Sequence, residues 1–237
     1  MAAASLSPFA ISFLLCCFLT LTILLGEEEV SPVFVSLSNV TNEFALLSFK
    51  SQVTRDSYNV LSNWNSNISF CLWNGVSCSR SSQRVVGLNL TDKALEGTLS
   101  PYISNLFFLQ VLHLSNNSFH GHLLVDFSRL PSLKILSIWG NHFKGLIPQT
   151  LGHCQGLQTL SAGDNQFYGS IPKFLGSLSE LKYLNIGGNR LTGTIPIQRN
   201  IPSKFGSLTH LMAFSMQRNN LTGTLPESLF TYPLFGV

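Results

Sequence analysis

Pairs of apolar residues two positions apart recur along the chain after residue 85. They are Leu88/Leu90, Leu112/Leu114, Leu136/Ile138, Leu160/Ala162, Leu184/Ile186 and Phe214/Met216, spaced by 24 residues except for a last interval of 30. Alternating apolar residues predict a short strand with one buried face, and a fixed period stacks such strands in parallel. Because each coil can bury its apolar face only against its neighbours, we expect a solenoid.

Asparagine and glycine recur in the same register. Each pair is followed by a glycine (Gly97, Gly121, Gly145, Gly169, Gly193 and Gly223), and from the second coil on an asparagine stands four residues before it (Asn117, Asn141, Asn165, Asn189 and Asn219). We expect each asparagine to turn inward and to satisfy backbone groups of adjacent coils, as a structural ladder. Lys93 occupies this position in the first coil, which we interpret as an end effect. The glycine permits the turn that leads away from the strand.

The coils are not uniform at the end of the chain. The six extra residues 197–202 lie between Gly193 and Gly223, and we expect them to bulge from the convex side as an inert insertion or an error in the gene prediction, rather than as a functional loop. Tyr232 and Phe235 fall where a seventh coil would open. The pattern thus predicts six repeats and the start of a truncated seventh over 81–237, with an exposed core edge that should aggregate or seek a partner.

The first 41 residues have a different character. The uncharged apolar run Phe9–Leu25 is followed by three glutamates, which favours a cleaved secretory signal over 1–26 and a short linker over 27–41. No later stretch is long and apolar enough for a membrane helix. After removal of Cys16 and Cys17, Cys71 and Cys78 are close enough in sequence to form a local disulfide, whereas Cys154 takes a leucine position and is interpreted as a buried thiol.

Five Asn-x-Ser/Thr sequences suit N-glycosylation in a secreted chain. They begin at Asn39, Asn67, Asn89, Asn116 and Asn220.

Charge and composition exclude several classes of function. The net charge is +3 and charged residues are 11% of the chain, without a Lys/Arg cluster, so nucleic acid binding is not expected. His120 and His122 flank a repeat glycine without acidic neighbours in ligand spacing, so no metal site is predicted. The acidic residues fall at unrelated phases of the repeat. We therefore expect no catalytic residues and no cofactor.

The chain resembles the ectodomains of plant leucine-rich-repeat receptor kinases and receptor-like proteins. Three repeats carry the plant-type motif, as Phe143-Lys144-Gly145-Leu146-Ile147-Pro148 and its equivalents ending at Pro172 and Pro196, and a matching cap runs from Glu43 through Trp64 to the segment 71–78. The resemblance implies an α/β leucine-rich-repeat solenoid, an open right-handed horseshoe arc with a parallel concave sheet, behind a helical N-terminal cap over 42–80. It also implies a Cys71–Cys78 disulfide. The cap and first repeats most resemble the immune-receptor subfamily that senses bacterial peptides.

The cap should contain one helix. Thr41 can cap a helix that starts at Asn42, with Ala45, Leu46 and Phe49 on its apolar face. Such a helix would cover the otherwise exposed core of the first coil.

The expected working surface is the concave side, where residues between and beyond each apolar pair face solvent. They run from 87–92 in the first coil to 213–218 in the sixth, and include Ile135, Ser137 and Thr159. As ligand-binding residues we select His113, Trp139, Ser161, Asp164, Tyr183, Asn185, Gln217 and Arg218. Exposed aromatic and arginine side chains are typical of binding hot spots. Sugars at Asn89 or Asn116 would direct a ligand toward repeats three to six.

These features predict a secreted, non-catalytic module that binds a peptide or protein ligand, with a co-receptor ectodomain as a further partner. It would be extracellular, or at the plasma membrane if the full-length product carries a membrane helix. The resemblance implies further repeats, a membrane helix and often a kinase in longer relatives; this chain has no kinase motif. Two alternatives stay open, a secreted inhibitor of microbial cell-wall-degrading enzymes and a nonfunctional fragment of a receptor gene.

Overall fold

The computed structural model describes residues 34–194 and 210–223. The chain divides into two compact units, 1–36 and 37–237. Residues 34–36, which begin a helix, are the only described residues of the first unit. The expected signal sequence, the extra residues 197–202 and the segment after Gly223 lie outside the described residues. Among the described residues, no helix is long and apolar enough to cross a membrane.

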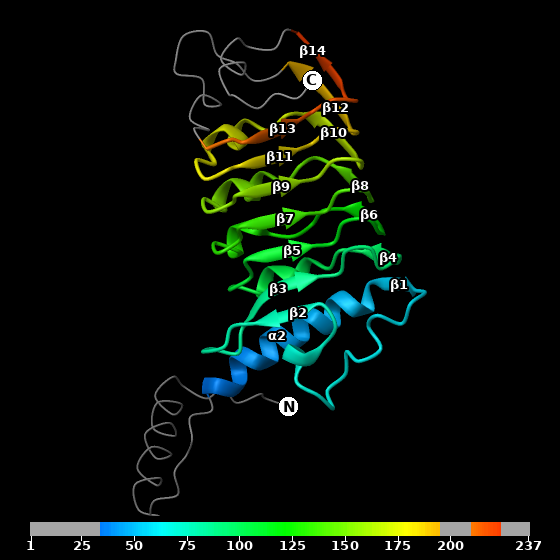
Figure 1. Ribbon diagram of the computed structural model, residues 1–237, viewed down its shortest axis with the longest axis vertical. Helices are drawn as coiled ribbons and strands as arrows, with labels where there is room; N and C mark the ends of the chain where they lie inside the picture. The colour runs from blue at the N-terminus through cyan, green and yellow to red at the C-terminus, as the bar shows by residue number, and fades with distance from the viewer. Residues whose placement is uncertain (1–33, 195–209, 224–237) are drawn as a thin grey trace, which may run out of the picture. The chain divides into compact units, whose positions relative to one another are not determined.

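The repeats form a stack of coils with the predicted parallel strands on one side (Figure 1). This concave sheet has the strand order β13-β11-β9-β7-β5-β3-β2. Its strands are β2 (Val76–Cys78), β3 (Val85–Asn89), β5 (Val111–His113), β7 (Ile135–Ser137), β9 (Thr159–Ser161), β11 (Tyr183–Asn185) and β13 (Ala213–Ser215). From β3 to β13 every pairing is parallel and in register, which confirms the solenoid.

A second sheet, which the sequence pattern did not predict, runs along the same coils. Its strand order is β1-β4-β6-β8-β10-β12-β14 (Figure 1). Its strands are β1 (Val53–Asp56), β4 (Leu95–Thr98), β6 (Ser118–His122), β8 (His142–Gly145), β10 (Gln166–Ser170), β12 (Arg190–Thr194) and β14 (Asn220–Thr222). We expected only a turn at the repeat glycine. Instead, each of these repeat strands continues up to its glycine or through it. The glycine has a positive φ and lies within the strand, at its end or directly after its last residue.

Short 3-10 helices complete the coils. They are η1 (Phe70–Leu72), η2 (Pro101–Asn105), η3 (Phe127–Arg129), η4 (Gln149–His153) and η5 (Lys173–Ser177). η4 and η5 follow Pro148 and Pro172, which occupy the N-cap positions and hold the entering backbone extended. Within the described ranges, the only α-helix is α2 (Phe34–Ser51).

Helix α2 starts earlier than predicted. It begins at Phe34 and not at Asn42, so Thr41 lies inside it, and residues 34–41, expected to be a linker, are helical. The sequence signal for a start at Thr41 was a hydroxyl side chain before an acidic residue, and such local signals fix a helix boundary only to within a few residues. Ala45, Leu46 and Phe49 are fully buried, as expected for the apolar face.

The cap closes the first edge of both sheets. β1 pairs antiparallel with β4, and β2 pairs antiparallel with β3, so the first parallel strand of each sheet is covered by a short antiparallel strand of the cap. Phe49 of α2 lies with its ring centroid 5.7 Å from that of Phe119, and Phe119 stacks on Phe143 at 6.3 Å. Phe49 therefore extends the row of buried phenylalanines formed by Phe119 and Phe143. Through this contact the helix covers the core of the first coil, as predicted.

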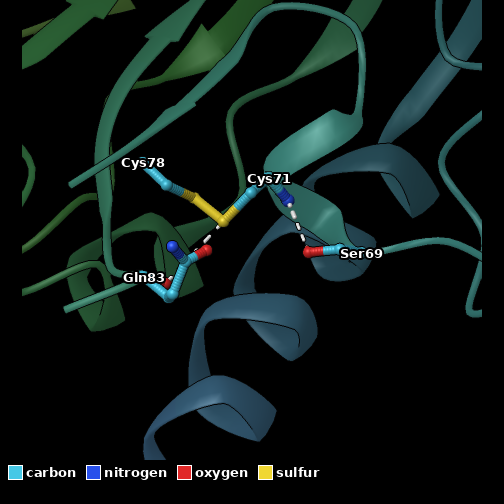
Figure 2. Close-up of a disulfide and its surroundings, with 4 residues drawn as sticks. All are labelled: Ser69, Cys71, Cys78 and Gln83. Atoms are coloured by element: carbon cyan, nitrogen blue, oxygen red, sulfur yellow. Dashed lines mark hydrogen bonds between the residues drawn. A yellow bond between two sulfur atoms is a disulfide. The ribbon is translucent and has the colours of Figure 1, made fainter. Parts of the chain in front are cut away.

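The expected disulfide joins η1 to β2. Cys71 and Cys78 are bonded, and the hydroxyl of Ser69 accepts a hydrogen bond from the Cys71 backbone N–H at 3.3 Å (Figure 2). The sulfur of Cys71 also lies 3.8 Å from the carbonyl oxygen of Gln83. The covalent link thus fixes the end of the strand that protects the edge of the concave sheet.

The asparagine ladder is confirmed in detail. The side-chain oxygen of Asn141 accepts from the backbone N–H of Phe119 at 2.9 Å, and its amide donates to the carbonyls of Leu114 and Ile138 at 3.0 and 3.1 Å. The equivalent bonds are made by Asn117, Asn165, Asn189 and Asn219. Each asparagine reaches back to the preceding coil, which explains why the first coil can carry Lys93 there.

The six extra residues do not interrupt this ladder. Asn219 bonds the N–H of Leu191 and the carbonyl of Ile186, 28 and 33 positions away, where the other coils show separations of 22 and 27. The difference of six in both bonds equals the length of the insertion. The coils on either side of residues 195–209 therefore stack as neighbours.

Candidate functional site

The concave sheet carries a shallow open hollow of about 480 Å³. It spans β5, β7, β9, β11 and β13, and its lining residues are His113, Ile135, Ser137, Thr159, Leu160, Ser161, Tyr183, Leu184, Asn185, Ala213, Phe214 and Ser215. Because side chains alternate along a strand, Leu160 and Leu184 point into the core and are almost fully buried, whereas the residues on either side of them face the hollow. The lining contains no Asp, Glu, Lys or Arg, so the hollow presents an apolar floor with neutral hydrogen-bonding groups.

Four of the eight predicted site residues line this hollow. Tyr183 is 46% exposed although it is a large aromatic side chain, and it lies beside Asn185 on the same strand. Asn185 is held by its own turn, because its side-chain oxygen accepts from the N–H of Gly187 at 3.1 Å. Ser161 and His113 are half-buried on β9 and β5.

Burial lowers the pKa of His113, because the charged imidazolium would lose water there. The ring is therefore kept neutral and can both donate and accept a hydrogen bond.

The other four predicted residues do not line the hollow. Trp139 is half-buried beyond the end of β7, and Gln217 is exposed beyond β13. Asp164 and Arg218 form an ion pair with a distance of 2.7 Å, with exposed fractions of 33% for the aspartate and 69% for the arginine. These two charges therefore already satisfy each other, and the sequence could not show this because they are 54 residues apart.

Glycine makes this ion pair possible. Asp164 and Arg218 belong to coils that are not adjacent, and Gly188 occupies the same position in the coil between them. A Cβ added at Gly188 would collide with the Asp164 carboxylate. The absence of a side chain there opens the path along which the arginine reaches the aspartate.

The pattern had placed several further lining residues on the concave side without selecting them. Ile135, Ser137 and Thr159 are of this kind. Phe214 was missed, since it was assigned to the buried apolar pair of the sixth coil and is only half-buried. Its exposure depends on packing around β13, which no residue pattern signals.

Four of the five predicted sequon asparagines, Asn67, Asn89, Asn116 and Asn220, are exposed, and the side chain of Asn39 lies outside those that the structure describes. Asn116 donates its side-chain amide to Asp92 at 2.6 Å, next to the early coils of the concave side. Asn89 borders a second cavity of about 540 Å³ between the cap and the first coil, lined by Tyr58, Asn59, Val60, Asn74, Gly75, Leu90, Thr91 and Lys93 besides Asn89. Asn89 and Asn116 both lie outside the residues that line the hollow.

Cys154 is buried, as expected, and unsuited to nucleophilic chemistry. Its thiol donates to the carbonyls of Phe127 and Leu130 at 3.4 and 3.6 Å, and burial raises its pKa to about 11. A thiol with so high a pKa carries almost no thiolate at neutral pH. In the described part of the chain, no group of three His, Cys, Asp or Glu side chains is arranged to hold a metal ion.

Comparisons with known proteins support this architecture. A family profile for a leucine rich repeat N-terminal domain matches residues 42–79, and a leucine rich repeat profile matches 108–130, 132–154 and 180–198. The LRR receptor-like serine/threonine-protein kinase EFR from Arabidopsis thaliana is 48% identical over 81 residues, which are 34% of this chain and 8% of that protein. The chain thus spans less than a tenth of this relative's length.

Solved structures show the same fold. The LRR ectodomain of the receptor kinase GASSHO1/SCHENGEN3 from Arabidopsis thaliana, in complex with CASPARIAN STRIP INTEGRITY FACTOR 2, matches with a TM-score of 0.73 and 34% identity over 79% of this chain and 22% of that chain. The BIR2 ectodomain from Arabidopsis thaliana matches with a TM-score of 0.65 and 30% identity over 77% of this chain and 94% of that chain. A plant ice-binding protein matches with a TM-score of 0.73 and 28% identity, over 82% and 61%.

Proposed function

The chain belongs to the plant leucine-rich-repeat family typical of receptor-kinase ectodomains, and we propose that it is a recognition module that binds an extended peptide across its concave sheet. It is a non-catalytic module. The observation that carries the proposal is the uncharged hollow over β5 to β13, with Tyr183 exposed on it. The fold alone does not select this ligand, since an ice-binding protein shares it.

The dimensions of the hollow suit a short extended segment. Five adjacent strands span four steps of about 4.8 Å, or roughly 19 Å, and an extended chain rises about 3.3 Å per residue. The hollow therefore accommodates roughly six peptide residues running across the coils. Neutral donors and acceptors such as Ser161, Asn185 and His113 can bond the peptide backbone, and Tyr183 can cover an apolar side chain.

Electrostatics favour an uncharged peptide segment at this site. A charged ligand side chain would lose water in the hollow without finding an opposite charge in the lining. The nearest described ion pair, Asp164–Arg218, is already satisfied. We therefore assign the concave hollow to an apolar or neutral stretch of ligand.

We place the module outside the cell. A disulfide and several exposed sequons fit an oxidising, glycosylating route of synthesis. A co-receptor ectodomain is a further partner in this proposal, supported by solved relatives that include a complex of BIR3 with SERK2 from Arabidopsis thaliana.

Two tyrosines give a matched test. Tyr183 lies in the hollow and Tyr168 on the second sheet, with exposed fractions of 46% and 50%. Peptides selected from a random phage-displayed library against the wild-type chain should bind Tyr183→Ala about 10-fold more weakly, because a buried aromatic anchor carries much of the binding free energy. Tyr168→Ala should bind within about two-fold of wild type. Equal affinity of both variants, or no selected peptide, would refute the concave-site proposal.

A further inference from the structure

The outward face of the second sheet is rich in basic side chains. On β6 and β8, Phe119 and Phe143 are buried, whereas His120, His122, His142 and Lys144 are exposed. Arg190 on β12 is also exposed. The strands β6, β8, β10 and β12 contain no Asp or Glu, and the nearest acidic residue along this sheet is Glu96 on β4. This face is therefore a basic surface, unlike the uncharged hollow.

Four of these side chains form a grid. In the parallel pairing of β6 with β8, His120 lies beside His142 and His122 beside Lys144. Neighbouring strands are about 4.8 Å apart, and positions two residues apart on one strand are separated by roughly 6.6 Å. Phe143, between His142 and Lys144, is buried and stacks on Phe119, which precedes His120, whereas Gly121 lies between His120 and His122. We call these four residues, with Arg190, the basic face.

The basic face has no ionic partner within the described residues. The only ion pair in the described ranges joins Asp164 to Arg218, which does not involve this sheet. Beside the grid, Leu146 and Tyr168 are exposed to 63% and 50%. Unpaired basic groups next to exposed apolar groups form a surface that an acidic partner would complement.

We propose that the basic face binds an extended acidic segment of a partner protein, with Asp or Glu at alternate positions. In an extended chain such side chains lie on one face, roughly 6.6 Å apart, which matches the spacing of His120 to His122 and of His142 to Lys144. Each carboxylate can then bond one basic group, and Leu146 or Tyr168 packs against an apolar residue of the partner.

The composition of the basic face favours a protein over other polyanions. The basic face contains only one Lys and one Arg, Lys144 and Arg190, whereas anionic membranes are typically bound by clusters of four to eight Lys or Arg. Nucleic acid binding likewise depends on the neutralisation of many phosphates. Histidine hydrogen bonds to individually placed carboxylates suit a short peptide better.

The test uses the full chain and two synthetic peptides of equal composition. One peptide alternates Glu and Thr over eight residues, and the other has four Glu followed by four Thr. At 0.15 M salt and pH 6, we expect the alternating peptide to bind the wild-type chain more tightly than the block peptide. Lys144→Gln should weaken binding about five-fold, whereas Lys173→Gln, which removes an exposed lysine of η5, should leave it within about two-fold.

The histidines supply a second readout. Histidine ordinarily changes charge between pH 5 and 8, so binding of the alternating peptide should weaken as the pH rises from 6 to 8. The variant with His120, His122 and His142 all changed to Gln should lose this dependence. Glu96, Lys144 and Arg190 are the other charged groups of the sheet between β4 and β12, and the triple variant leaves all three unchanged.

Several outcomes would overturn the proposal. These are equal binding of the two peptides, equal losses in Lys144→Gln and Lys173→Gln, or binding to phosphatidylserine vesicles that depends on the same side chains. Tyr183→Ala should bind the acidic peptide normally, so the result is independent of the concave-site proposal. All substituted side chains are exposed, so the variants should fold, and thermal unfolding checks this directly.

Discussion

The concave sheet and the second sheet are made by the same coils, yet they present different chemistry to solvent. The concave strands from β5 to β13 surround a hollow without charged side chains, whereas β6, β8 and β12 expose five basic ones. Strands of both sheets bury apolar side chains in the same core, such as Leu136 on β7 and Phe143 on β8. The difference therefore lies only in the outward positions, which the packing of the solenoid leaves free to vary.

This comparison separates architecture from recognition. The buried positions and the asparagine ladder repeat almost without change, because each coil must satisfy its neighbours. Two outward faces on one stack give a module two independent surfaces. One suits a neutral extended peptide and the other an acidic segment, so a ligand and a second partner need not compete.

The largest expected effect comes from the ladder that joins the two sheets. Asn165→Leu leaves the buried N–H of Phe143 without its acceptor and removes the amide bonds to Ile138 and Ala162. We expect a loss of about 3 kcal/mol in the free energy of unfolding, because buried backbone groups become unsatisfied. Urea unfolding measures it, with the exposed Ser170→Ala in the same coil as control. A loss below about 1 kcal/mol would show that water replaces the ladder.

A second prediction compares glycines of the two sheets. Gly145 on β8 has φ of +98°, and an added Cβ would lie 2.6 Å from the His122 ring, so Gly145→Ala should cost about 2 kcal/mol. Gly163, beyond β9, lacks the positive φ, and its Cβ would meet only the side chain of Asn185 at 2.6 Å. Because that side chain can move, Gly163→Ala should cost roughly 1 kcal/mol or less.

The effects of the two substitutions on peptide affinity should have the opposite order to their effects on stability. Gly163→Ala displaces Asn185 from the hollow and should weaken peptide affinity, whereas Gly145→Ala should not affect concave binding in the folded protein. If Gly145→Ala proved the less destabilising of the two, the positive φ would not determine the role of the repeat glycine.

A smaller effect is expected for the ion pair between coils. A double-mutant cycle with Asp164→Asn and Arg218→Gln should give a coupling of about 0.5 kcal/mol, since exposed pairs are weak and pay for ordering two side chains. The coupling should vanish in 1 M salt. A coupling that persists in high salt would contradict the interpretation of this pair as a weak, solvent-screened surface interaction.

The smallest predicted effect is the pH dependence due to His113. Burial lowers the pKa of His113 in the folded state below its ordinary value of 6.5. As the pH falls through that ordinary value, His113 therefore binds protons more readily in the unfolded chain than in the folded chain. Its contribution to stability is therefore complete above about pH 6.5 and decreases as the pH falls. His113→Gln should flatten the stability profile between pH 7 and 5, measured by denaturant unfolding. His142→Gln, an exposed histidine of the second sheet, is the control.

Much of the architecture could be predicted from the residues because it repeats. The repeat strands of the concave sheet, the asparagine ladder and the Cys71–Cys78 disulfide were all expected and are observed. The start of α2 and the second sheet were not. The second sheet depends on pairing between successive glycine-containing segments, which local signals describe poorly, and a helix boundary such as the start of α2 at Phe34 is poorly fixed by nearby residues.

The site was predicted in part. The strand pattern identified the residues on the concave side, and His113, Ser161, Tyr183 and Asn185 do share one hollow. It could not show that Asp164 and Arg218 neutralise each other across Gly188, because that contact joins coils that are not adjacent. It also could not separate Trp139 from the hollow, since both sets of residues follow the same alternation.

The sequence by itself determined which side chains are buried in each coil, because the 24-residue period leaves the leucines, phenylalanines and asparagines no other way to be satisfied. Only the tertiary structure decided which exposed residues become neighbours. The distance between two side chains in different coils depends on the register of the sheets and on the gaps left by glycine, and neither is a local property of the chain. The uncharged hollow and the basic face are both products of that register.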